Sequence, residues 1–174
     1  MSDTSTALAL CQKYIHDVES KNLHGVDETL DGNARQIFRH TKQVRKAGMF
    51  AEVSSGKLTG AVIAVLKGKP DVLAYTKGLM ENFQKIKWVD TEWKVSSSGR
   101  EIYFFGRGDM ITAKSGKPYQ NVYVTRFDVH QDRITEINEI GDATLYLGLG
   151  IPPNAAQLRA FGRALLRLIG IGSR

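Results

Sequence analysis

The spacing of apolar residues changes along the chain, from a helical repeat in the first half to strict alternation in the second. A helix over about Thr6–Lys21 is predicted by apolar residues that share one face, at Leu8, Cys11, Ile15 and Val18. A short second helix is expected to end near Leu30, before Asp31-Gly32-Asn33. Gly68-Lys69-Pro70-Asp71 predicts the start of another helix, which should end near Gln84.

Strands are predicted on both sides of that last helix. Ala34–His40 alternates, with Ile37 and Arg39 on the face opposite Phe38 and His40. Leu58–Leu66 has the apolar and β-branched content of a buried strand, although it is also compatible with a helical segment. Between them, Thr41–Lys57 combines mixed charge with glycines, and we expect an irregular or helical insertion there. From Lys87 onward the alternation predicts an antiparallel meander of four strands, over Lys87–Val95, Glu101–Thr112, Pro118–Val129 and Arg133–Gly141.

The end of the chain has a different pattern. Pro152-Pro153-Asn154 should break the chain, and a helix is expected over about Ala155–Ile169. This helix has a basic stripe of arginines and an apolar seam, the seam at Leu158, Phe161, Leu165 and Leu168. The pattern is typical of a packed tail helix or a subunit contact, and a membrane-surface helix is the other alternative.

This order of elements predicts an α+β fold. We expect a cone-shaped, curved antiparallel sheet of the cystatin-like roll type, with the N-terminal helices packed over its concave face. Residues 1–151 would form this cone domain, with an insertion at about residues 41–66. Residues 152–174 would form the C-terminal amphipathic tail helix.

Composition narrows the classes of function. The chain has 174 residues, of which 42% are hydrophobic and 24% charged, so one folded domain is expected. The net charge of +6 comes from scattered Lys and Arg without interleaved aromatic residues, which argues against nucleic-acid binding. No apolar run approaches the roughly 20 residues of a membrane-spanning helix, so we expect no membrane insertion. Because the single cysteine, Cys11, cannot form an intrachain disulfide, a cytoplasmic location is expected.

Metal and cofactor sites find no support in the sequence. The spacing typical of metal ligands is absent from the four histidines, His16, His24, His40 and His130. The glycines are too dispersed to form a phosphate-binding loop. Cys11 lies on the apolar stripe of the first helix, where a thiol is a poor nucleophile. We therefore expect no metal and no cofactor.

The strand over Glu101–Thr112 contains the first candidate chemistry. Arg107 and Asp109 are two residues apart, so they share a face and can contact each other. A guanidinium keeps a neighbouring carboxylate ionised while burial acts the other way, so the pKa of that carboxyl is tunable. If Glu139 joins them from a neighbouring strand, two carboxylates bracket one cation and can hold a water between an acid and a base. A structural ion pair at the sheet edge is an equally good interpretation of Arg107 and Asp109.

The following strand presents Asn121 and Tyr123 on one face. A buried phenol needs a hydrogen-bond partner, either a substrate oxygen or a backbone carbonyl. The turn at Ser115-Gly116 sets the register: a two-residue turn puts Tyr123 on the face opposite Asp109, and a three-residue turn pairs the two residues on one face. In the strand predicted over Lys87–Val95, alternation places Trp88 and Trp93 on opposite faces.

Several short motifs resemble one superfamily. Gln12-Lys13-Tyr14-Ile15, with Asn22-Leu23-His24-Gly25 after it, is similar to the first helix of the ketosteroid isomerases. Arg126-Phe127-Asp128 resembles their penultimate hairpin. With the order of elements, these motifs resemble the nuclear transport factor two-like superfamily, in its SnoaL-like and ketosteroid isomerase-like branch.

This resemblance implies particular roles. Tyr14 matches the tyrosine of the oxyanion hole in the ketosteroid isomerases, and Tyr123 falls where those enzymes have a protonated Asp. The position of their general-base Asp is occupied by Phe38, which departs from the pattern.

A second resemblance is to limonene epoxide hydrolase. Arg107-Gly108-Asp109 is similar to its catalytic Arg-x-Asp, and Gly116-Lys117-Pro118-Tyr119 is similar to its turn, one residue shorter. The acid on the last strand falls at Glu139, a Glu in place of an Asp. The resemblance therefore implies Asp109 and Glu139 as acid and base, with Arg107 holding one of them ionised.

We thus expect a cofactor-independent acid–base enzyme that acts on a small hydrophobic, oxygenated molecule of polyketide or terpenoid type. An isomerase, cyclase, dehydratase or epoxide hydrolase would fit, and a non-catalytic ligand-binding or assembly module is the alternative. The expected catalytic residues are Asp109, Arg107, Glu139, Tyr14 and Tyr123. The expected substrate-binding residues are Trp88, Tyr103, Phe105, Asn121 and Phe38. We expect a cytoplasmic homodimer that associates through the open face of the sheet.

Overall fold

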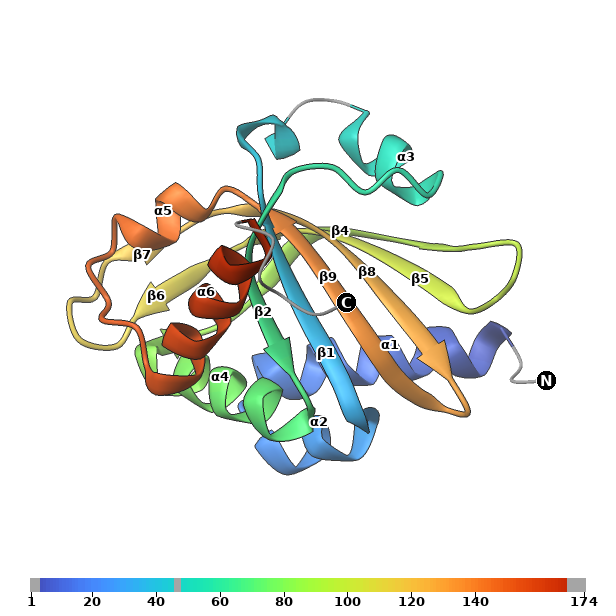
Figure 1. The fold of residues 1–174 in the computed structure, drawn as a ribbon, viewed down its shortest axis with the longest axis horizontal. Coiled ribbons are helices and arrows are strands. Elements are labelled where there is room, and N and C mark those ends of the chain that lie inside the picture. Colours follow the sequence, from blue (N-terminus) through green and yellow to red (C-terminus); the bar gives the residue numbers. More distant parts are fainter. Residues whose placement is uncertain (1–3, 46–47, 169–174) are drawn as a thin grey trace.

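A curved six-stranded sheet forms the centre of the molecule (Figure 1). The computed structural model describes residues 4–45 and 48–168. Across the sheet the strand order is β2-β1-β9-β8-β5-β4. Their bounds are β1 (Leu30–His40), β2 (Ala61–Lys67), β4 (Trp88–Val95), β5 (Glu101–Gly108), β8 (Val122–His130) and β9 (Arg133–Gly141).

The meander from β4 to β9 confirms the alternating pattern, but the whole sheet is not antiparallel. β1 pairs with β9 in parallel, and every other neighbouring pair is antiparallel. β1 follows directly after α2 and lies beside β9, the last strand of the chain, with both strands running in the same direction. The α+β fold is confirmed, and the sheet is mixed rather than antiparallel.

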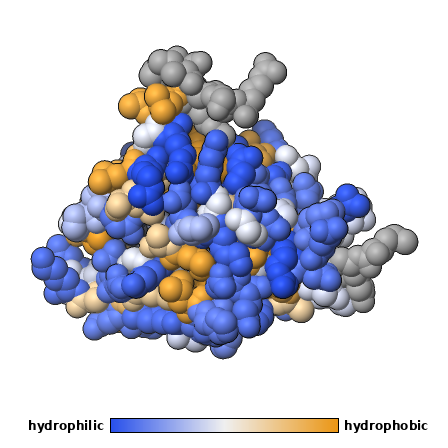
Figure 2. All heavy atoms as spheres, turned by 60° about the horizontal axis from the view of Figure 1, so that its bottom comes forward, coloured by the Kyte–Doolittle hydropathy of each residue, from blue (hydrophilic) through white to orange (hydrophobic). Residues whose placement is uncertain are grey.

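Helices α1 (Thr4–Glu19), α2 (Leu23–Thr29) and α4 (Lys69–Asn82) cover the concave face. The apolar stripe of α1 is buried against the sheet, at Ala7, Cys11, Tyr14 and Val18. The helical stretch breaks over residues 20–22, and α2 starts at Leu23 because the Asn22 side chain accepts a hydrogen bond from Gly25 N–H and caps it. Asp31-Gly32-Asn33 lies inside β1 rather than stopping a helix. Figure 2 brings this helical side forward and shows a mainly hydrophilic surface with apolar patches between.

The insertion after β1 covers part of the outer face of the sheet. It contains the short helices η1 (Lys42–Arg45) and α3 (Met49–Ser54), as its mixed pattern allowed. Phe50 of α3 packs on Phe105 of β5, with ring centroids 5.9 Å apart. A second apolar cluster results, made of Val44, Met49, Phe50, Val53, Tyr103, Val124 and Ile140. Tyr103 and Phe105 therefore belong to the outer face of the sheet.

A β-bulge in β4 changes which side chains share a face. Asp90 has φ 55°, and the pairing with β5 shifts by one residue between Val89 and Glu92. Trp88 and Trp93 consequently lie on the same side, where their ring centroids are 6.3 and 4.6 Å from that of Phe104. The prediction of opposite faces was wrong, because alternation holds only where no extra residue interrupts the ladder.

The long strand predicted over Glu101–Thr112 is interrupted at Asp109, whose N–H donates to Lys87 O at 2.8 Å. Beyond the break, β6 (Met110–Thr112) pairs with β7 (Pro118–Tyr119) and β3 (Phe83–Lys85) in a small second sheet. Because β3 begins at Phe83, α4 ends before the predicted Gln84. The Thr112 N–H donates to Lys117 O at 2.9 Å, so the connection spans residues 113–116 and is longer than either predicted turn. Gly106 pairs with Tyr123 in this register, whereas Arg107 pairs with Val122 on the other face.

Helices α5 (Ala143–Leu147) and α6 (Ala155–Leu168) complete the described fold, and α6 packs on β2 (Figure 1). The predicted end of the last helix, Ile169, lies outside the described residues. The side of α6 that faces the sheet is formed by small residues four apart, Ala156, Ala160 and Ala164. Leu158 and Leu165 of the predicted seam are 58% and 60% exposed. These two leucines thus point outward, since the helix approaches β2 through its alanines, whereas Phe161 of the seam lines a cavity.

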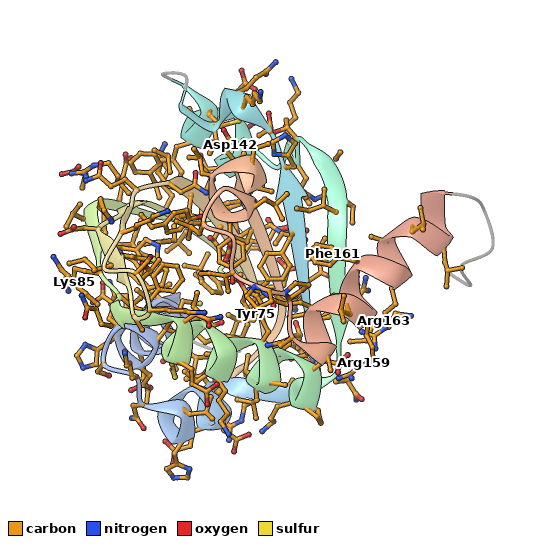
Figure 3. All side chains as sticks on the ribbon, turned by 90° about the vertical axis from the view of Figure 1, so that its left-hand side faces the viewer. Tyr75, Lys85, Asp142, Arg159, Phe161 and Arg163 are labelled. Carbon is orange, nitrogen blue, oxygen red and sulfur yellow. The ribbon has the colours of Figure 1, made fainter. Side chains whose placement is uncertain are left out.

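One carboxylate fastens α6 to α4. Asp71 accepts hydrogen bonds from Arg159 Nη2 at 2.8 Å and from Arg163 Nη1 at 2.6 Å. Figure 3 labels the two arginines on α6. Burial acts to raise the pKa of the Asp71 carboxyl, but the two guanidinium groups outweigh it and hold that pKa below its usual value. Arg159 and Arg163 of the basic stripe are therefore turned toward Asp71, where they fix the helix.

We expect Asp71→Asn to loosen α6, because the two arginines lose their shared charged partner. The free energy of unfolding should fall by about 1–2 kcal/mol, a value reduced by the partial exposure of both arginines. Trypsin should cleave after Arg159 and Arg163 faster in the variant than in the wild type. Glu81→Gln, at an exposed pair on the same helix, is the matched control and should change neither quantity. Equal cleavage rates in Asp71→Asn and the control would contradict this role of Asp71.

Candidate functional site

A mainly apolar cavity of about 120 Å³ lies on the concave side of the sheet. Its walls come from β1, β8 and β9, with α4, α5 and α6 closing it from the other side. Figure 3 shows Tyr75 of α4 and Phe161 of α6 between these elements. The polar side chains in the lining include Tyr75, Tyr119, Asn121, Tyr123 and Glu139.

A smaller inner chamber of about 30 Å³ adjoins this cavity. The two spaces share five lining residues, which are Tyr75, Leu79, Trp88, Tyr123 and Glu139. The inner chamber is also lined by Tyr14, Gln36, Thr76 and Thr125. Glu139 therefore lies where the outer cavity meets the inner chamber.

Glu139 is a half-buried residue whose carboxyl lines both spaces and has no counter-ion. It stands on β9, with Phe38 beside it on β1 and Thr125 beside it on β8. Within residues 4–45 and 48–168, no hydrogen bond or ion pair to its carboxyl is found. Burial raises the pKa of the Glu139 carboxyl to about 7, because the charged form is poorly solvated there. Near neutral pH this group can therefore both take up and release a proton.

Three linked polar side chains form one wall beside Glu139. The Tyr123 hydroxyl donates to the Tyr119 hydroxyl at 2.8 Å, and Asn121 Nδ2 donates to the same oxygen at 3.1 Å. A phenol oxygen has two acceptor positions and one proton, so the Tyr119 proton remains for another partner. Burial raises the pKa of Tyr119 to about 12, which keeps that proton in place at neutral pH. Tyr119 can therefore donate a hydrogen bond to an oxygen in the cavity.

The neighbouring strand leaves room for this wall. Gly141 of β9 pairs with Tyr123. A Cβ atom at Gly141 would come within 3.3 Å of both Asn121 Nδ2 and the Tyr123 ring. The Asn121 amide is fixed by a second bond, from Nδ2 to Asp142 O at 3.2 Å. The wall is thus held rigidly by backbone and side-chain contacts.

Two more phenols face Glu139 from the helices. Tyr14 of α1 lines the inner chamber, and its ring packs edge-on against Phe127 at 5.6 Å. Tyr75 of α4 lines both spaces. Burial and then the charge of Glu139 raise the pKa of both phenols, so both stay protonated. Tyr14 and Tyr75 thus remain neutral phenols in the spaces that Glu139 lines.

The structure brings six of the ten predicted site residues together around these two spaces, namely Glu139, Tyr14, Tyr123, Asn121, Trp88 and Phe38. Tyr75, Tyr119 and Gln36 also line these spaces, although no site role was predicted for them. Tyr75 could have been found from its place on the buried stripe of its helix, and Tyr119 from its shared face with Asn121. Gln36 gave no signal, because a lone amide in a strand is usually solvated.

The other four predicted residues lie elsewhere, and this corrects the expected pocket. Arg107 Nε donates to Asp90 Oδ2 at 2.9 Å, and Lys85 Nζ donates to Asp109 Oδ2 at 2.7 Å. The side chains of Arg107 and Asp109 are each 39% exposed and do not pair with each other. Tyr103 and Phe105 face the α3 side with them, because odd-numbered residues of β5 point away from the cavity.

Neither a metal cluster nor a membrane span is found in the part of the chain that the structure describes. Its His, Cys, Asp and Glu side chains form no group of three or more that could hold a metal ion. No helix among these residues is both long and apolar enough to cross a membrane.

The position of Glu139 predicts a pH-dependent stability. Its folded-state pKa lies above the unfolded value, so the wild type should lose stability as pH rises from about 4.5 to about 7. Glu139→Gln cannot ionise, so its free energy of unfolding should exceed that of the wild type by up to about 3 kcal/mol near pH 8. Near pH 5 this difference in free energy of unfolding should be small. Exposed Glu92→Gln is the control, and a gap independent of pH would contradict the assignment.

Comparisons with known proteins bear on the fold. No family model matches the chain, and no curated protein sequence matches it. A nuclear transport factor two-like protein of Burkholderia xenovorans LB400 has a TM-score of 0.62 and 11% identity, over 85% of this chain and 98% of that one. A SnoaL-like protein of Jannaschia sp. CCS1, proposed to be a polyketide cyclase, has a TM-score of 0.61 and 16% identity, over 86% and 94%.

An LEH-like epoxide hydrolase of M. tuberculosis is also similar, with a TM-score of 0.53 and 10% identity, over 95% of this chain and 97% of that one. At such identities the likeness concerns the fold, and it agrees with the superfamily that the sequence motifs resemble. The chain thus has the nuclear transport factor two-like fold.

Proposed function

We propose that the protein is a cofactor-independent acid–base enzyme that acts on a small, hydrophobic, oxygenated molecule. The observation that carries the proposal is Glu139, a carboxyl without a partner at the junction of an apolar cavity and its inner chamber. Burial brings the pKa of this carboxyl to about 7, where a proton-transfer group is most effective at neutral pH. A carboxyl kept for stability alone would instead be paired.

In this proposal Glu139 and Tyr119 divide the chemistry. Ionised Glu139 would take a proton from a substrate carbon or hydroxyl, or from a water. Tyr119 would donate its remaining proton in a hydrogen bond to the oxygen on which negative charge develops. Tyr123 and Asn121 hold the Tyr119 oxygen in place, so the donor is oriented before the reaction begins.

Isomerisation, cyclisation, dehydration and epoxide opening all combine a proton transfer with charge on oxygen, so each is compatible with this arrangement. The similar folds of a protein proposed to be a polyketide cyclase and of an LEH-like epoxide hydrolase support the proposal at the level of the fold. Arg107 and Asp109 have no part in this scheme, because each is paired on the outside of the sheet.

A second candidate is a binding protein with the same cavity and no chemistry. Phe38 favours it, because this phenyl ring stands next to Glu139 at the position where the ketosteroid isomerase pattern has its general base. In that case Glu139 would be a protonated donor to a ligand oxygen. Association as a homodimer and a cytoplasmic location stay predictions, and α3 covers part of the face expected to associate.

The proposal predicts that the protein turns over at least one member of a panel of small cyclic epoxides, enones and β-hydroxy ketones. The value of kcat/KM should rise with pH through about 7, because the base acts when ionised. Glu139→Gln should lower kcat by roughly 10²–10⁴-fold, and Tyr119→Phe by a smaller factor.

Exposed Glu92→Gln is the control and should keep full activity. The enzyme proposal would be contradicted if the wild type bound members of the panel without turning any of them over. It would also be contradicted if Glu139→Gln kept wild-type turnover. The first of these results would support the binding protein.

A further inference from the structure

Large apolar side chains are exposed mainly on one helix. In the part of the chain that the structure describes, one such residue lies on α5 and four lie on α6, namely Leu147, Leu158, Phe161, Leu165 and Leu166. Over residues 155–166, Arg159 is the only exposed polar residue. Figure 3 shows α6 at one side of the molecule, extending beyond the sheet. An exposed apolar surface of this kind marks a contact with a partner.

Four exposed positions of α6 form a regular row, which we call the outer seam. They are Ala155, Leu158, Gly162 and Leu165, separated by three, four and three residues. This is the spacing of the a and d positions of a heptad repeat, which keeps a row of side chains facing a second helix along its whole length. Small residues occupy the a positions, and leucines occupy the d positions. The outer seam is therefore patterned for a helix as its partner.

The outer seam is complementary to itself when two copies run antiparallel. With the two-fold axis at the level of Ala160, Leu158 of one copy lies opposite Gly162 of the other. Leu165 then lies opposite Ala155 of the other copy. Each leucine fills the space beside a small residue, as close packing requires. A parallel pair would instead place leucine against leucine and leave a gap between the two glycines.

Charge also favours a second copy over an anionic lipid surface. Arg159 and Arg163 are both paired with Asp71, at 2.8 and 2.6 Å. Their charges are therefore already compensated within the chain, and the outer seam itself has no charge. Two copies can approach each other along this seam without uncompensated repulsion between their arginines.

We infer that the outer seam of α6 binds the outer seam of a second copy of this chain, as an antiparallel helix pair with two-fold symmetry. This inference does not depend on the proposed function. The 14 residues of α6 span about 21 Å, so the contact belongs with interfaces below about 1,200 Å² in total. We therefore expect a weak dimer whose population rises with concentration. Phe161 lies beside the seam and lines the outer cavity, so the second copy would lie next to that cavity.

Two variants test the fit from opposite directions, by sedimentation equilibrium between about 1 μM and about 1 mM. Leu165→Gln should raise the Kd of the dimer roughly 100-fold, because two leucines per pair lose their apolar contact. Gly162→Leu should raise it at least tenfold, because the added side chain meets Leu158 of the other copy. In the single chain a Cβ atom at Gly162 meets nothing within 4 Å, so this variant should fold with unchanged or higher stability.

Gly32→Leu is the matched control and should keep the wild-type Kd. Gly32 is exposed on β1, and a Cβ atom there also meets nothing within 4 Å. The inference would be overturned by a Gly162→Leu variant that associates as strongly as the wild type or more strongly, since that result indicates unspecific apolar contact. A wild type that stays monomeric at about 1 mM, whether or not it binds phosphatidylglycerol vesicles, would overturn it as well.

Disulfide formation tests the direction of the two helices. The native Cys11 is buried, so introduced thiols can be followed separately. A mixture of Ala155→Cys and Leu165→Cys should form a disulfide between the two variants, because these positions lie opposite each other in the antiparallel pair. Neither variant alone should crosslink, since each position is then about 15 Å along the helix from its own copy, beyond the roughly 7 Å that a disulfide can bridge. Crosslinking of the single variants without a mixed product would indicate a parallel pair and overturn the arrangement.

Discussion

The burial of one carboxyl without a counter-ion is the constraint on which the site depends. An ionised carboxylate in apolar surroundings is costly unless it is paired, and Glu139 has apolar and phenolic neighbours instead of a cation. The pKa of the Glu139 carboxyl is therefore close to 7, so both its protonated and its ionised form are populated near neutral pH. The core around it, formed by α1, α4 and the concave face of the sheet, supplies the stability that such a group removes.

Strand register decides which side chains share this space. Tyr123 is opposite Gly106 on β5 and Gly141 on β9, so the phenol lies over two positions without side chains. Arg107, one residue further along β5, faces the other side for the same reason. A shift of one residue between β5 and β8 would have paired Arg107 with Tyr123 and put the two side chains on the same face. The chemistry of the site is in this sense a consequence of the connection over residues 113–116 and of the break at Asp109.

Much of the fold follows from periodicity, because helices and strands differ in the spacing of their buried residues. The stripe of α1 and the alternation of β8 and β9 are enough to predict that Tyr14, Tyr123 and Glu139 point into the interior. The prediction from Arg107-Gly108-Asp109 was wrong, because the sequence motif does not specify on which face of the sheet its side chains lie. Turn length and the bulge at Asp90 set that direction, and neither leaves a clear mark in the local sequence.

Pairing between strands far apart in the sequence could not be predicted either. The parallel contact of β1 with β9 joins segments about a hundred residues apart, and no local pattern specifies it. The same contact places Phe38 beside Glu139. The tail helix shows a similar limit, because its apolar seam and its alanine face have the same period. Only the fit against β2 selects the alanines as the inner face.

A direct titration of the Glu139 carboxyl by ¹³C NMR, assigned with Glu139→Gln, examines the central claim. The structure predicts a midpoint at about 7. A midpoint near the ordinary glutamate value of about 4.3 would mean that water or a cation reaches the carboxyl, and would contradict the account.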